Sequence, residues 1–189
     1  TCSTVLPHLL SSVQVEMLNV NARLTPDQPT ETPERRSDAL RRLGLMVAPS
    51  RAALGVRIDP TGERLSIVDE TGRVLSDDRA LLVVLDLIAA ERRSGAVALP
   101  VTTTRVAEQV AAYHGVDVIW TPTGPQALAV ASNRPDVILA GDAEGGFVIP
   151  SVGTAPDAMA ALLAILGLVV WTRSASPEIY TRIPNTVLL

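Results

Sequence analysis

The chain has 189 residues, enough for one large domain or two small ones. With 47% hydrophobic residues, 19% charged residues and a formal net charge of −4, its composition is that of a globular protein with ample material for a core. All 16 basic residues are arginine, so chemistry that depends on a lysine ammonium, such as a P-loop or a Schiff base, is excluded. We find no basic patch interleaved with aromatic residues and expect no nucleic-acid partner.

Cysteine usage and hydropathy bear on the compartment. Cys2 is the single cysteine, so no internal disulfide can form, as is usual in a reducing cytoplasm. The first residues lack the build of a signal peptide, and the longest apolar run, 158–171, is shorter than the roughly 20 residues that span a bilayer. We therefore predict a cytoplasmic protein without a membrane partner. The chain starts directly with a helix pattern, and we interpret it as a fragment of a longer protein.

The first half of the chain combines apolar periodicity with long polar stretches. Its predicted elements, in chain order, are a helix over 4–12, a strand over 13–20, a loop over 21–34, a helix over 38–47, a strand over 54–58, an acidic loop over 59–64, a strand over 65–68, a turn over 69–72 and a strongly apolar helix over 79–93.

The second half repeats the alternation of strands and helices. Its predicted elements are a strand over 96–101, a helix over 105–114, a strand over 116–120, a short helix that ends near 132, strands over 136–140 and 147–150, and helices over 156–172 and 177–182. Strands that alternate with helices twice over predict an α/β fold of two domains, with helices on both faces of each sheet. We place the boundary in or near the helix over 79–93.

The acidic loop after the strand over 54–58 is a candidate metal site. An extended loop directs Asp59, Thr61 and Glu63 to one side, where two carboxylates and a hydroxyl suit a hard cation such as Mg²⁺. Arg64 beside them can hold a phosphate with its planar guanidinium. The alternative is a tight β-hairpin in which residues 60–62 make the turn and the last two side chains are solvated, and spacing alone favours this alternative.

Three other polar features each allow a functional and a structural interpretation. The loop over 141–146 carries Asp142 and Glu144, which suit sugar hydroxyls better than phosphate, but a plain polar loop explains it equally well. His114 stands before a glycine at a helix end, where a capping or surface role is favoured over catalysis. Residues 102–104, three threonines, are best explained as a cap of the following helix.

The acidic loop also carries a family resemblance. Asp59-Pro-Thr-Gly-Glu-Arg64, followed by a strand and the turn Asp69-Glu-Thr-Gly72, resembles the metal loop of the α-D-phosphohexomutases, the phosphomannomutase and phosphoglucomutase family, which reads Asp-x-Asp-Gly/Ala-Asp-Arg. Residues 105–121 are similar to the start of the third domain, and 141–146 falls where the family has a sugar-binding Gly-Glu-x-Ser-Gly-His loop. The resemblance implies two consecutive three-layer αβα domains with mixed sheets, the metal-loop domain II over 1–93 and the sugar-loop domain III over 94–189.

The family pattern assigns roles to single positions. It implies a catalytic role for Arg64, metal binding at Asp59, Thr61 and Glu63, and substrate binding at Asp142, Glu144 and Gln126. Two of the three metal-binding aspartates are replaced, by Thr61 and Glu63. In the sugar loop Asp142 stands for the glutamate and Glu144 for the serine, while Gln126 stands where the family often has a lysine. The resemblance therefore implies a degenerate site in which Mg²⁺ is weakly bound or lost.

Further runs point to one branch of the family. Residues 55–60, 77–82, 98–105 and 145–150 are similar to the mutase-like region of mannose-1-phosphate guanylyltransferase/phosphomannomutase-type proteins. This implies a region that binds a sugar phosphate or a nucleotide sugar and is fused to or associated with a nucleotidyltransferase domain. Two alternatives stay open: the central domains of an active Mg²⁺-dependent phosphohexomutase, and a scaffold for assembly, such as that of a homo-oligomer.

Overall fold

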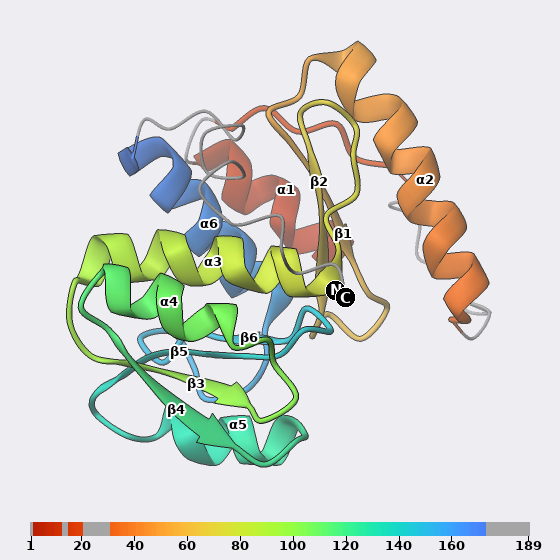
Figure 1. Cartoon of the computed structure of the whole chain (residues 1–189). Coiled ribbons are helices and arrows are strands. Elements are labelled where there is room, and N and C mark those ends of the chain that lie inside the picture. The colour runs from red at the N-terminus through yellow and green to blue at the C-terminus, as the bar shows by residue number, and fades with distance from the viewer. Residues whose placement is uncertain (1, 13–14, 21–30, 173–189) are drawn as a thin grey trace.

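A computed structural model describes residues 2–12, 15–20 and 31–172 of the chain, and it contains two β-sheets that each have helices on both faces (Figure 1). This arrangement confirms the predicted α/β class and its three-layer organisation. Within the described ranges, no helix combines the length and the apolar character needed to cross a membrane.

The first sheet is an antiparallel hairpin of β1 (Leu54–Ile58) and β2 (Leu65–Asp69). Side chains alternate across it, so that Val68 packs with α2 (Pro33–Ser50) on one face, while Leu65 and Ile67 join the main core on the other. The second face is covered by α6 (Ala158–Thr172) and by the start of α3 (Asp77–Arg92). Helix α1 (Cys2–Ser12) adds Leu6 and Leu10 to the same core.

The second sheet has the strand order β4-β3-β5-β6 and is mixed. Strands β3 (Ala96–Pro100), β4 (Asp117–Thr121) and β5 (Val137–Gly141) are parallel, and β6 (Phe147–Val148) is antiparallel to β5. Helix α5 (Pro125–Ser132) covers one face, and α3 and α4 (Val106–Tyr113) cover the other (Figure 1). The carboxyl ends of the three parallel strands therefore lie at one edge of the sheet, where α/β proteins place ligands.

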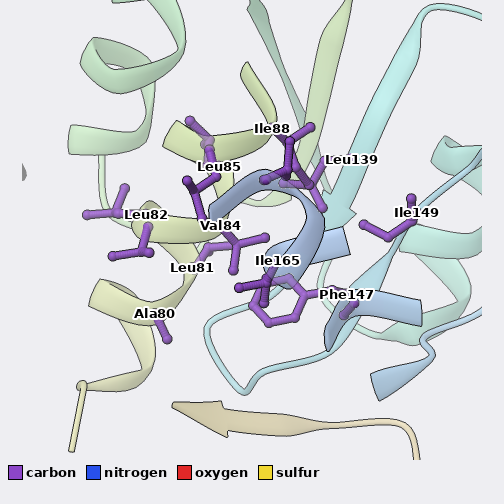
Figure 2. Packing of buried hydrophobic residues seen from close by; sticks show 14 of the residues in the cluster. Ala80, Leu81, Leu82, Val84, Leu85, Ile88, Leu139, Phe147, Ile149 and Ile165 are labelled. Atoms are coloured by element: carbon purple, nitrogen blue, oxygen red, sulfur yellow. The ribbon is translucent and has the colours of Figure 1, made fainter. Parts of the chain in front are cut away.

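Helix α3 is the centre of the packing. Residues 80–89 are all buried, because α3 packs against β2, β5, α4 and α6 together. Figure 2 shows its aliphatic side chains beside Leu139, Phe147 and Ile165, which come from β5, β6 and α6. A helix that is buried on every side needs an apolar sequence all round, and the run over 80–89 has this character with one exception, Asp86.

The exception is compensated by a histidine. His114 is the C-cap residue of α4, and its backbone N–H donates to the carbonyl of Ala111 at 3.0 Å, but its imidazole does not cap the helix as predicted. Its side chain, however, is not on the surface: it is 9% exposed, and Nε2 lies 2.7 Å from Oδ1 of Asp86. The pair ties α4 to α3, and the buried carboxylate gains the partner that burial demands.

Most predicted elements are confirmed, with two corrections. The strand predicted over 13–20 is wrong for the described residues 15–20, which form neither helix nor strand and leave Leu18 72% exposed, because apolar alternation makes a strand only beside a partner strand. Helix α2 begins at Pro33 instead of residue 38, because Thr32 accepts a hydrogen bond from the backbone of Arg35 and proline suits the first helical turn. The predicted helix over 177–182 lies outside the described residues.

Gly44→Ala is expected to destabilise the protein. A methyl group at this position of α2 would lie 2.3 Å from the carbonyl oxygen of Gly72. Overpacking costs about 1–3 kcal/mol, more than the roughly 1 kcal/mol that alanine contributes over glycine in a helix. Gly167→Ala is the matched control, since Gly167 also lies inside a helix and has nothing within 4 Å of the added methyl group. Urea denaturation should separate the two variants, and equal free energies of unfolding would contradict the close contact.

Asp86→Ala is expected to lower the free energy of unfolding by about 1–3 kcal/mol, because it leaves the buried imidazole of His114 without its partner. A double-mutant cycle with His114→Ala should give a coupling energy of about 0.5–3 kcal/mol. Thermal or urea denaturation of the four proteins measures it. Additive effects of the two substitutions would refute the pair.

Candidate functional site

Three turns of the chain share one construction. Each begins with an aspartate at the end of a strand and has a glycine three residues later: Asp59–Gly62 after β1, Asp69–Gly72 after β2 and Asp142–Gly145 after β5. The glycines have φ angles of 79°, 86° and 88°, the left-handed region that other residues avoid. In each turn the aspartate carbonyl accepts from the glycine N–H, at 3.1, 2.9 and 3.4 Å, and the aspartate carboxylate accepts from backbone N–H groups further along the turn.

Asp59 therefore closes its own loop. Its Oδ1 accepts from the backbone N–H groups of Glu63 and Arg64 at 2.9 and 3.0 Å, and its Oδ2 accepts from the hydroxyl of Thr61 at 2.6 Å. Partial burial raises the pKa of Asp59, but the hydrogen bonds from Thr61 and from the backbone of residues 62–64 outweigh it and hold the pKa below its ordinary value. This geometry is the hairpin that the sequence left as the alternative to a cation site.

The three predicted metal positions do not form a cage. Both carboxylate oxygens of Asp59 already accept hydrogen bonds, the hydroxyl of Thr61 points at one of them, and Glu63 is exposed. Among the described residues, no group of three or more His, Cys, Asp or Glu side chains is placed to hold a metal ion. A hard divalent cation needs several oxygen ligands around one point, and the side chains of this loop do not fit that requirement.

The acidic loop and the sugar loop lie side by side. The backbone N–H of Leu65 donates to the carbonyl of Gly145 at 3.0 Å, and Arg64 and Gly146 form an antiparallel bridge. On the other side of the acidic loop, the carbonyl of Gly62 accepts from the first residue of α6 at 2.9 Å. The contact at Gly145 is close: a Cβ atom there would lie 2.2 Å from the carbonyl oxygen of Leu65, so only glycine fits.

Two predicted site residues are brought into contact by this arrangement. Nη1 of Arg64 lies 2.7 Å from Oε2 of Glu144, and the two side chains are 46% and 64% exposed. Asp142, by contrast, belongs to its turn, because its Oδ1 accepts from the backbone N–H groups of Glu144 and Gly146, both at 2.9 Å. The structure thus joins the guanidinium of one loop to a carboxylate of the other.

Gln126 lies at the same edge of the sheet but on another element. It is exposed in the first turn of α5, after the carboxyl end of β4, whereas the sugar loop follows β5 two strands away.

A cluster at this edge escaped the sequence reasoning. The guanidinium carbon of Arg105 lies 4.3 Å from the centroid of the Trp120 ring, and Oε1 of Glu108 accepts from both side chains, at 2.7 and 2.9 Å. Arg105 follows the loop after β3, and Trp120 is the penultimate residue of β4. The sequence could have indicated this cluster by the position of these residues at the carboxyl ends of two neighbouring parallel strands.

A separate groove of about 560 Å³ lies between α2 and the turn over 69–72. It is lined by apolar and polar side chains, among them Leu40, Arg41, Leu45, Thr71 and Val74. None of the predicted site residues lines it. We therefore assign the candidate site to the paired loops, where the convergent charged groups lie, and not to this groove.

The fold and the site define an α/β protein with two polar loops that meet at the carboxyl edge of a mixed sheet. Comparisons with known proteins identify its family. The family model described as phosphoglucomutase/phosphomannomutase, alpha/beta/alpha domain III, matches residues 76–187. The chain belongs to the phosphoglucomutase/phosphomannomutase family.

Individual relatives agree with this assignment. A probable phosphoglucosamine mutase of Methanopyrus kandleri is 26% identical over 181 residues, which is 96% of this chain and 40% of that protein. A phosphoglucomutase/phosphomannomutase of Thermococcus kodakarensis is 26% identical over 148 residues, or 78% of this chain and 32% of that protein. The chain thus spans about two fifths or less of these relatives' length.

Among solved structures, a phosphoglucomutase/phosphomannomutase family protein from Burkholderia thailandensis is similar with a TM-score of 0.81, at 18% identity, over 98% of this chain and 41% of that one. At this level of identity the likeness shows the shared fold.

Asp59→Asn and Asp69→Asn are expected to flatten the loss of stability in acid. Burial raises the pKa of Asp69, but bonds from Thr71 and Arg73 outweigh it, so both aspartates have a lowered folded-state pKa. Each then contributes stability that is fully present above the unfolded pKa of about 4 and is lost as the pH falls through the lower folded pKa.

Urea denaturation at several pH values between about 7 and 2 measures this effect. The free energy of unfolding of the wild-type protein should fall below about pH 4, and each variant should start lower at neutral pH and fall less. A variant that keeps the wild-type pH dependence would show that its carboxyl group does not close the turn.

Proposed function

We propose that the chain is the sugar-phosphate-binding region of a phosphohexomutase-type protein and that its own mutase chemistry is degenerate. The observation that carries the proposal is the docking of the acidic loop on the sugar loop, with Arg64 held against Glu144 at 2.7 Å while Asp59 is committed to its turn. In this arrangement Arg64 is still placed to bind a phosphate, whereas Asp59, the proposed metal ligand, stabilises its own turn.

The proposed binding groups act by hydrogen bonding and charge. Arg64 presents parallel N–H groups that fit a phosphate in a bidentate manner and neutralise part of its charge. Both turn bonds of Asp142 go to Oδ1, so a sugar hydroxyl can donate to Oδ2. Gln126 offers an amide to the same edge of the sheet without a fixed positive charge. Together these groups would orient a phosphorylated sugar at the carboxyl edge of the second sheet.

The proposal includes the domain division, the compartment and the cofactor state. We assign residues 1–93 to the metal-loop domain and 94–189 to the sugar-loop domain of the family, with Mg²⁺ weakly held or lost. Support for the cofactor state comes from the ligand set of Asp59, Thr61 and Glu63, in which the aspartate is bound by its own loop. The cytoplasm is proposed from the single cysteine, which leaves this chain without an internal disulfide.

A finer proposal concerns the protein around this region. The runs over 55–60, 98–105 and 145–150 resemble the mutase-like part of mannose-1-phosphate guanylyltransferase-type proteins, and this resemblance supports a linked nucleotidyltransferase domain. The sequence of the full-length gene product tests it: a glycine-rich nucleotidyltransferase motif before Thr1 is the expected finding, and a mutase first domain in its place would contradict the proposal.

The names of the relatives favour a second candidate. Three relatives over most of this chain are named probable phosphoglucosamine mutases, so the chain is alternatively the central part of an active hexosamine-phosphate mutase. The two candidates differ in turnover. Conversion of glucosamine 1-phosphate, glucose 1-phosphate or mannose 1-phosphate that depends on Mg²⁺ would favour the active mutase, and binding without turnover would favour the degenerate region.

Arg64→Gln is expected to weaken the binding of these three sugar phosphates at least tenfold, because hydrogen bonds to charged groups contribute about 1.5–3 kcal/mol. Isothermal titration calorimetry of the full-length protein measures it. Arg134→Gln is the matched control, since Arg134 pairs with Asp136 before the amino end of β5, at the opposite edge of the sheet. An Arg64→Gln variant that binds as well as the wild type would refute the assignment of Arg64.

A further inference from the structure

The pair formed by Arg64 and Glu144 has a consequence for the ligand. A carboxylate and a phosphate offer the same kind of oxygen acceptors to a guanidinium, and both bind along its N–H groups. Oε2 of Glu144 already lies 2.7 Å from Nη1 of Arg64. The glutamate therefore occupies a position on Arg64 that a phosphate oxygen would take.

The backbone holds this pair in place from both sides. The residue after Arg64, Leu65, donates to the carbonyl of Gly145, the residue after Glu144, at 3.0 Å. The backbone N–H of Glu144 is itself bound by Oδ1 of Asp142 at 2.9 Å. Exposed ion pairs usually contribute little because two long side chains must be ordered, but here the two backbones are already fixed beside each other.

We propose that Glu144 is an internal competitor for the phosphate site on Arg64 and that it lowers the affinity of the site for anionic ligands. A phosphorylated ligand binds only when the Glu144 side chain turns away from Arg64, and its 64% exposure leaves room for that movement into solvent. The inference rests on the proposed function, since it assigns the phosphate of the same ligand to Arg64.

Glu144 weakens the binding of all anions, but not to the same extent. A sugar phosphate carries up to two negative charges and binds the guanidinium through two oxygens, so it displaces a single carboxylate. Displacement of Glu144 costs the same free energy for a ligand with one carboxylate as for a phosphate, so the competition by itself leaves the ratio of their affinities unchanged. Glu144 also repels the second charge of the phosphate at short range, so its removal strengthens phosphate binding more than the binding of a monoanion.

Glu144→Gln tests the inference directly, because glutamine keeps the shape and removes the charge. The full-length protein is titrated with glucose 1-phosphate, mannose 1-phosphate and glucosamine 1-phosphate, and with gluconate as a monoanionic sugar acid. The variant is expected to bind the sugar phosphates about 2- to 5-fold more tightly than the wild type. Gluconate should also bind more tightly to this variant, but by a smaller factor, because Glu144 repels its single charge less than the two charges of a phosphate.

Three further variants isolate the cause. The double variant Glu144→Gln/Arg64→Gln should bind no better than Arg64→Gln alone, since the gain comes from the freed guanidinium. Asp136→Asn removes an equal charge from a 2.9 Å arginine pair at the opposite edge of the sheet and should match the wild type. Glu144→Ser is a second removal of the carboxylate, and circular dichroism confirms that each variant is folded.

The outcomes separate the inference from the proposed function. Sugar phosphates that bind equally well to wild type and to both folded Glu144 variants, but poorly to Arg64→Gln, would overturn the competition and leave the phosphate site in place. A gain that persists without Arg64, or that Asp136→Asn reproduces, would assign the effect to net charge and overturn the inference. Binding to none of the proteins would overturn the proposed function together with it.

Discussion

The arrangement of the site depends on one backbone contact between two loops that are about 80 residues apart in the sequence. The N–H of Leu65 binds the carbonyl of Gly145, and the approach is so close that a Cβ atom at residue 145 would lie 2.2 Å from a carbonyl oxygen. Through this contact the β1–β2 hairpin is fixed to the turn that joins β5 and β6. The position of Arg64 beside Glu144 follows from it, because each stands next to one of the two bonded residues.

The acidic loop shows how one residue pattern serves two purposes. The resemblance to the family's metal loop predicts a metal ligand at Asp59, and the structure shows a turn-closing aspartate there, as at Asp69 and Asp142. A carboxylate that accepts bonds from its own loop stabilises the hairpin and loses freedom to coordinate a cation. The bonds within the turn are therefore sufficient to explain an aspartate at this place. The proposed contact with a phosphate rests on Arg64 instead.

The sequence predicted correctly those elements whose packing partner is close in the chain. It failed where the partner is distant in the sequence. Strands β1 and β2 are joined by a short hairpin loop, and their bounds were predicted within one residue. Residues 15–20 alternate as well, yet they form no strand, since alternation alone supplies no neighbour to pair with. His114 was expected at the surface because the sequence does not show that the end of α4 packs on Asp86 in the middle of α3.

By itself, the sequence determined the α/β class, the family and the chemical types available to the site, because periodicity, turn residues and motif spacing are local properties of the chain. The tertiary structure determined which of those residues contact each other. It brings Glu144 into contact with Arg64 and directs the Asp59 carboxylate to the backbone of its own hairpin loop. It also brings Arg105, Glu108 and Trp120 together near one edge of the second sheet. These relations join residues that lie on different elements, and only the packing of the hairpin, α3 and the second sheet sets their distances.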